Sequence, residues 1–168
     1  MILALDLSTK SSGYAIFEDS DLISYGCLTA SSTDAIERIQ KIIFNLEDKI
    51  LNKYDIKEII IEEVHPEKEN TNQKNMRTHK VLMWLQAALE FLIHDKYSNI
   101  SINYIFPSEW RKICGIRTGR EIRREALKKE DIKFVKEKYN IEMNDDEADA
   151  TCIGYAYLDK KNNRIDWE

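Results

Sequence analysis

Two short segments of the chain are apolar on both of the faces that a β-strand would present. They cover residues 2–7 (ILALDL) and 58–64 (EIIIEEV). Strands of this kind lie in the middle of a sheet that is covered on both sides. Between them, Ile36, Ile39 and Ile43 recur at helical spacing within a helix expected over 33–54, capped by Ser32 or Thr33. A helical crossover makes the two strands parallel neighbours, so the sequence predicts an α/β fold.

The remaining segments complete a mixed sheet. Segments 13–18 and 22–28 are typical of strands and form a meander with the first strand, whereas 66–75 is expected to be a loop. The order β-β-β-α-β-α-β-α-α predicts a five-stranded sheet with helices on both faces, in one domain covering 1–168. The later elements of this order are a helix through 81–93, a strand at 100–106, a basic helix at 120–139 and a last helix from 144 or 145 to about 158. A short helix at 107–112, not counted in the order, is also expected.

Composition narrows the protein classes. A chain of 168 residues with 43% hydrophobic residues suits one globular domain. No apolar run approaches the roughly 18 residues of a membrane span, and the first residues lack the basic start of a signal peptide. We therefore expect a cytoplasmic protein of a bacterial cell, including a phage-infected one. Three widely separated cysteines predict reduced thiols rather than disulfides or a zinc site.

The charge is unevenly distributed along the chain. The net charge is −5, but residues 111–138 hold eleven Lys or Arg against five Asp or Glu, a local +6. The rest of the chain carries 14 − 25 = −11. This division predicts a basic strip that can follow phosphates, together with a separate acidic cluster. A solvated helix with pairs of opposite charge is the plainer alternative for the basic strip.

Carboxylates stand at three places where packing alone does not call for them. Asp6 ends the first buried strand, and Glu62 or Glu63 ends the second; alternation lets only one glutamate face a given side. Asp146 and Asp149 are three residues apart on the last helix, where a cap or first-turn acid is the plainer alternative. Parallel strands end at one edge of the sheet, where open α/β sheets bind ligands, so these carboxylates are expected to lie close together. Carboxylate oxygens are the ligands that Mg²⁺ and Mn²⁺ prefer. Two such ions hydrolyse phosphodiesters in many nucleases.

Three motifs in this order resemble the RuvC family of Holliday-junction resolvases, within the ribonuclease H-like superfamily. They are DLSTKSSGYA at 6–15, IIIEEV at 59–64 and DEADA at 146–150. The PSEWRK motif at 107–112 is most similar to the bacteriophage branch, the resolvases of lactococcal phages among them. The resemblance covers nearly the whole chain and implies a ribonuclease H-like fold.

The resemblance also implies roles for individual residues. The family's metal-binding carboxylates fall on Asp6, Glu62, Asp146 and Asp149, and Lys129 matches a catalytic basic residue. Two positions depart from the family: its Asp-Pro-Gly turn is Asp-Leu-Ser here, and His65 replaces an aromatic residue that wedges into the junction centre. His65 either stacks on a base or caps the loop.

The resemblance implies a homodimer that cuts branched DNA with one or two Mg²⁺ or Mn²⁺ ions per site, and we expect two. The other residues expected at the DNA are basic, apart from His65: Lys68, Lys74, Arg77, Lys80, Arg111, Lys112, Arg117, Arg120, Arg123, Arg124 and Lys128. Two rival functions remain open, a flap, fork or RNA nuclease of the same fold, and a protein that binds junctions without cutting them. An actin-like ATPase would need Gly-rich phosphate loops, and the chain has only five glycines.

Overall fold

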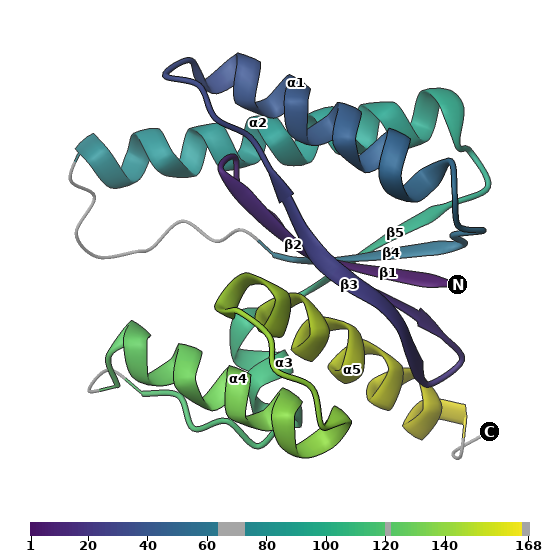
Figure 1. Cartoon of the computed structure of the whole chain (residues 1–168), viewed down its shortest axis with the longest axis vertical. Coiled ribbons are helices and arrows are strands. Elements are labelled where there is room, and N and C mark those ends of the chain that lie inside the picture. Colours follow the sequence, from purple (N-terminus) through teal and green to yellow (C-terminus); the bar gives the residue numbers. More distant parts are fainter. Residues whose placement is uncertain (64–72, 120–121, 166–168) are drawn as a thin grey trace.

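A central sheet separates two layers of helices (Figure 1). The computed structural model describes residues 1–63, 73–119 and 122–165. The strands are β1 (Ile2–Asp6), β2 (Ser11–Glu18), β3 (Asp21–Thr29), β4 (Glu58–Glu62) and β5 (Ser101–Ile105). The helices are α1 (Ala35–Leu46), continued by a π-helical turn at Glu47–Leu51, α2 (Gln73–Lys96), α3 (Pro107–Ile113), α4 (Arg124–Tyr139) and α5 (Asp145–Ile165). Helices α1 and α2 cover one face of the sheet, and α3, α4 and α5 cover the other.

The strand order confirms the predicted mixed sheet. Five strands lie in the order β3-β2-β1-β4-β5. The first three form the antiparallel meander, whereas β4 runs parallel to both β1 and β5. Leu5 pairs with Ile61, so β1 and β4 end side by side. The parallel strands therefore end at one edge of the sheet.

Alternation along β1 and β4 decides what each face of the sheet carries. Leu5 and Ile61 point into the layer of α1 and α2, whereas Ala4 and Ile60 point toward α5, and all four are fully buried. Burying one large aliphatic side chain contributes about 1.5–3 kcal/mol. Asp6 and Glu62 share the side of Ala4 and Ile60 because side chains alternate with period two. The carboxylates therefore face α5.

Small residues let α5 lie close to the sheet. A Cβ atom on Gly13 would lie 1.9 Å from the backbone oxygen of Asp146, and one on Gly154 would lie 2.2 Å from the ring of Phe17. Neither distance is possible for a real Cβ, so glycine is required at both positions. Gly13 also pairs with Asp6 across β1 and β2. This contact therefore brings the start of α5 directly beside the end of β1.

Several helix limits differ from those expected. The N-cap of α1 is Asp34 rather than Ser32 or Thr33; its side chain accepts a hydrogen bond from the backbone N–H of Glu37, at 3.0 Å. Helix α2 already begins at Gln73, α4 begins only at Arg124, and α5 continues to Ile165. Helix α4 starts late because Arg123 has extended backbone angles (φ −68°, ψ 145°). Within the described residues, no helix is long and apolar enough to cross a membrane.

Candidate active site

The two parallel strands each end on a half-buried carboxylate. Burial, followed by the negative charges of Glu62 and Asp146, raises the pKa of Asp6 to about 7. Burial also raises the pKa of Glu62, although the indole N–H of Trp110 donates a hydrogen bond to its Oε2 at 2.7 Å. Of the two glutamates left open by the sequence, Glu62 therefore faces this site. Burial is the largest cause of both shifts, and neighbouring carboxylates add to it against the opposing effect of nearby basic side chains.

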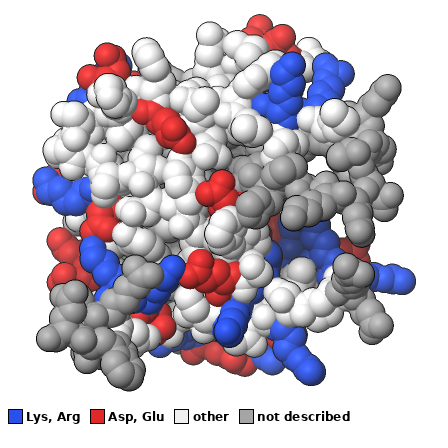
Figure 2. All heavy atoms as spheres, turned by 180° about the vertical axis from the view of Figure 1, so that it is seen from behind, with Lys and Arg blue, Asp and Glu red and all other residues white. Residues whose placement is uncertain are grey.

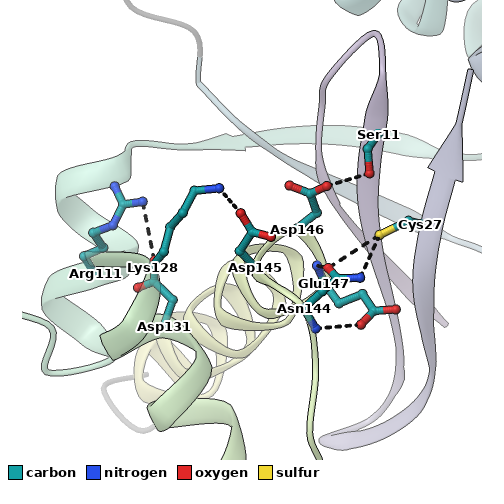
Figure 3. A network of polar contacts seen from close by, with 9 residues as sticks. All are labelled: Ser11, Cys27, Arg111, Lys128, Asp131, Asn144, Asp145, Asp146 and Glu147. Carbon is teal, nitrogen blue, oxygen red and sulfur yellow. Dashed lines mark hydrogen bonds and ion pairs between the residues drawn. The ribbon is translucent and has the colours of Figure 1, made fainter. Parts of the chain in front are cut away.

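The first turn of α5 supplies the next carboxylate. Asn144 and Glu147 form a capping box, in which each backbone N–H donates to the other residue's side chain, at 2.9 and 3.0 Å. This cap fixes the start of the helix beside β2. There the hydroxyl group of Ser11 donates to Asp146 Oδ2 at 2.5 Å (Figure 3). The sequence identified Asp146 but not Ser11, which precedes Gly13 on the same strand.

Asp149 lies one turn further along α5, toward the interior. Burial, together with the charges of Asp6 and Asp131, raises the pKa of Asp149 to about 9. Its Oδ1 is buried and has no hydrogen-bond partner among the described residues. A buried carboxylate oxygen without a partner is costly in free energy unless a cation or proton compensates it. Asp149 therefore has the environment expected of a residue that binds a cation.

Basic side chains of α4 lie beside these carboxylates. Lys128 forms an ion pair with Asp145, and both Lys128 and Arg124 lower the pKa of Asp6 against the larger effects that raise it. Figure 3 shows Lys128 reaching across to the start of α5. Lys129, predicted as the catalytic basic residue, is the next residue on α4 and is exposed. The structure thus brings Lys128 to the carboxylates, and the catalytic role of Lys129 stays a prediction.

Sequence reasoning missed two further residues of the site, Trp110 and Asp131. Asp131 is fully buried on α4, and its Oδ2 lies 3.8 Å from Nη2 of Arg111 (Figure 3). Neither oxygen of Asp131 has a hydrogen-bond partner among the described residues. A signal was present in the sequence, because Asp131 lies four residues after Leu127 and four before Val135. That spacing places an acid within the apolar stripe of the helix.

The residues predicted to contact DNA divide into three groups. Arg111 and Lys128 are half-buried, and Arg111 stacks over the Trp110 ring, with its guanidinium carbon 4.1 Å from the ring centroid. His65, Lys68 and Arg120 lie outside the described residues, and Lys74 lies in α2 with its side chain outside the description. The exposed residues of the set are Arg77, Lys80, Lys112, Arg117, Arg123 and Arg124. One group of Lys and Arg side chains lies along the right-hand edge of Figure 2, the side on which β1 and β4 end.

The carboxylates suit a hard divalent cation. In the described part of the chain, no three His, Cys, Asp or Glu side chains are already grouped as ligands of an ion. However, Asp6, Glu62 and Asp149 have raised pKa values, and one oxygen of Asp149 lacks a partner. These donors are all carboxylate oxygens, which Mg²⁺ and Mn²⁺ prefer. The residues present therefore fit such an ion.

Comparison with known proteins gave structural matches only. No family model matches the sequence, and no curated protein is similar enough to count as a match. Among solved structures, RuvC from T. thermophilus in complex with Holliday junction substrate superposes with a TM-score of 0.69 at 13% identity, covering 96% of this chain and 94% of that one. The fold is that of a RuvC-type resolvase. A second structure of Thermus thermophilus RuvC has a TM-score of 0.68 at 13% identity, covering 96% of each chain.

Two further resolvases share this RuvC-type fold. The Fowlpox virus resolvase, solved with substrate Holliday junction DNA, has a TM-score of 0.52 at 15% identity, with 95% of this chain and 99% of that chain covered. The yeast mitochondrial Holliday junction resolvase has a TM-score of 0.52 at 16% identity, with 94% of this chain and 78% of that chain covered. The predicted α/β class with its five-stranded mixed sheet is therefore confirmed.

Proposed function

We propose that this chain is a divalent-metal-dependent endonuclease that resolves Holliday junctions and cuts related branched DNA. One observation carries the proposal. Two parallel strands and the start of α5 carry Asp6, Glu62, Asp146 and Asp149 on one side of a RuvC-type sheet, where burial, together with nearby negative charges, raises the pKa values of three of them. Such crowding suits cations that neutralise it. Four resolvase structures with the same fold support DNA junctions as the substrate class.

The carboxylates would hold two Mg²⁺ or Mn²⁺ ions. Asp6 would be shared between them, Glu62 would bind one, and Asp146 with Asp149 would bind the other. Bound ions of this kind lower the pKa of water and stabilise charge on a phosphate, and hydrolysis would leave 5′-phosphate and 3′-hydroxyl ends. Lys128 and Arg124 add positive charge beside the scissile phosphate, and Lys129 is the further basic residue implied by the resemblance.

DNA would approach along the edge where these strands end. Exposed basic residues of the linker between α3 and α4, together with Lys80 and Arg77 near the start of α2, would bind its phosphates, and a group of Lys and Arg side chains lies on the side where β1 and β4 end (Figure 2). Phosphates are attracted to such a strip without regard to base sequence. We extend the binding surface to His65, Lys68, Lys74 and Arg120 on the basis of the sequence alone. The PSEWRK motif favours a role in phage DNA processing within a bacterial cell.

We propose that the protein acts as a homodimer through α2 and β5. β5 is an edge strand, and an open edge is a liability unless something covers it. A groove of about 830 Å³ lies between it and α2, lined in part by Phe91, Ile102 and Tyr104. Trp84 and Met83 are also exposed on α2, at 42% and 53%. Figure 2 shows a broad, mostly uncharged area on this side of the molecule, with isolated Asp or Glu side chains within it, as expected of a dimer contact.

A substrate panel tests the proposal. The wild-type chain should cut four-way junctions in Mg²⁺ or Mn²⁺, whereas Asp6→Asn should lower the cleavage rate at least 10³-fold with junction binding retained. Asp19→Asn, at an exposed turn on the opposite end of the meander, is the matched control. Preference for forks, flaps or RNA–DNA duplexes would indicate the rival nuclease. Binding without cleavage in Mn²⁺ would indicate the architectural protein.

A further inference from the structure

Trp110 makes a contact that packing alone does not require. It is the largest fully buried side chain of the described residues, and it lies on α3. Its single polar atom, the indole Nε1, donates to Glu62 Oε2 at 2.7 Å. A buried indole needs some acceptor, and a backbone carbonyl would serve as well. Here the acceptor is a carboxylate of the proposed metal centre.

The geometry around Trp110 is fixed from several sides. Ile105, the last residue of β5, pairs with Glu62, and its carbonyl accepts a hydrogen bond from the Glu63 N–H at 2.9 Å. Pro107 then starts α3 at once, so Trp110 is carried over the end of β4. The Arg111 guanidinium stacks at 4.1 Å from the Trp110 ring centroid. The indole therefore has little freedom to rotate.

The indole N–H donates to Oε2 of Glu62, and no hydrogen bond from the described residues reaches Oε1. Oε1 is therefore the oxygen that can bind a cation. A charge-assisted hydrogen bond of this length is stronger than a neutral one and sets the plane of the carboxylate. Outer partners that orient metal ligands in this way commonly change metal affinity 10- to 100-fold when they are removed.

We infer that Trp110 is a positioning residue, which orients the Glu62 carboxylate for the divalent ion through its indole N–H. The inference rests on the proposed function of Glu62 as a metal ligand. It adds that α3 is part of the centre, because one residue of this helix holds a ligand and the next braces that residue. Neither the carboxylate motifs nor their spacing assigns this role.

The first test is metal affinity without DNA. Trp110→Phe keeps the ring in the core but removes the donor, so we expect the Kd for Mn²⁺, measured by calorimetry on the full chain, to rise about 10-fold or more. The Mg²⁺ concentration for half-maximal junction cleavage should rise similarly, while junction binding in EDTA stays within 2-fold. Leu158→Ala is the control, because it opens a cavity in the same layer about 13 Å along α5 from Asp149. It should lower Tm and leave Mn²⁺ affinity unchanged.

The second test follows the indole itself and does not depend on the fold of the Trp110 variant. The chain has three tryptophans, and Trp84→Phe and Trp167→Phe assign the Trp110 signal in ¹⁵N–¹H spectra. That signal should shift upfield in Glu62→Gln and respond to Mg²⁺ only when Glu62 is present. The inference is overturned if the Trp110 signal shifts neither in Glu62→Gln nor on addition of Mg²⁺. It is also overturned if Trp110→Phe binds Mn²⁺ with wild-type affinity.

These outcomes separate the inference from the proposed function. If Glu62→Gln cuts junctions at the wild-type rate, the proposed metal centre is wrong. If Glu62→Gln is inactive while Trp110→Phe binds Mn²⁺ normally, only the positioning role of Trp110 is wrong.

Discussion

The two faces of the sheet are covered by layers of opposite character. The layer of α1 and α2 packs large aliphatic residues onto Leu5 and Ile61, and none of the fully buried charged side chains in the described part of the chain belongs to it. In the other layer, α5 packs closely onto the sheet through Gly154 and alanine residues, and this layer buries Asp131 and one carboxyl oxygen of Asp149. One layer on this sheet therefore stabilises the fold through apolar burial. In the other layer, buried carboxylates lower the free energy of unfolding. Four predictions test this division.

The largest effect should come from filling the contact between β2 and α5. Gly13→Ala places a Cβ 1.9 Å from a backbone oxygen of Asp146, so α5 must move. We expect about 4 kcal/mol or more of destabilisation in urea unfolding and complete loss of cleavage.

Gly26→Ala is the matched control on β3. Its Cβ would meet only the end of the Tyr14 side chain, at 2.9 Å, and that end can shift. The loss should stay near 1 kcal/mol with cleavage retained. Equal effects of the two substitutions would contradict the division between the layers.

A cavity in the opposite layer should affect stability alone. Leu89 on α2 is fully buried in the aliphatic cluster. Leu89→Ala should lower the free energy of unfolding by about 3 kcal/mol. Well below the midpoint of thermal unfolding, the Mg²⁺ dependence of cleavage should match that of the wild type. A changed Mg²⁺ dependence would mean that the aliphatic layer also tunes the site.

Removing a buried carboxylate should stabilise the metal-free protein. Asp149 binds a proton more tightly in the folded protein than in the unfolded chain, because folding raises its pKa from 3.8 to about 9. Its contribution to stability is therefore present at acidic pH and is lost as the pH rises through this range. In EDTA at pH 8, Asp149→Asn should gain about 2 kcal/mol over the wild type, and much less at pH 5.

The matched control for Asp149 is an acid at the surface. Glu142 is exposed, and its hydrogen bond with Lys136 lowers its pKa, so Glu142→Gln should show no gain at pH 8. A pH profile of unfolding in Asp149→Asn that equals the wild-type profile would show that Asp149 ionises normally. With saturating Mg²⁺, the order of stability should reverse, because the wild type gains ligand binding.

The smallest effect should come from replacing a single basic residue beside the carboxylates, which should change only DNA binding. Lys128→Gln should weaken junction binding several-fold and reduce the slope of log affinity against log salt by about 0.9. Lys41 is an exposed residue of α1 in the other layer, and Lys41→Gln should change neither the junction affinity nor its salt dependence. Fluorescence anisotropy at several salt concentrations measures both. If Lys41→Gln has the same effect, the DNA surface is not confined to one layer.

The sequence predicted the sheet well, because its signals are local. Both central strands are apolar on two faces, and the helix between them requires a parallel pair. The acids at 6 and 62 stood out for the same reason, since each interrupts an apolar run. Helix limits were predicted less well: Asp34 outcompeted Ser32 and Thr33 as the cap of α1, a choice that depends on tertiary context.

The contacts that complete the site could not be deduced from local pattern. Trp110 meets Glu62 only because β5 pairs with β4 and α3 turns back over both. The proximity of Lys128, rather than Lys129, to the carboxylates depends on the rotation of α4 against α5, and one residue corresponds to about 100° of that rotation. Such facts come from packing between segments that are far apart in the chain.

The close contact of Gly13 with the start of α5 also has a consequence for biosynthesis. Helix α5 follows every other described element in chain order, yet it covers Ala4 and Ile60 and contributes Asp146 and Asp149. A nascent chain still short of Asp145 would leave that side of the sheet bare and would hold only half of the four carboxylates. The proposed metal centre would therefore assemble late, after the other described elements have been made, and a product truncated before Asp145 is expected to lack cleavage activity.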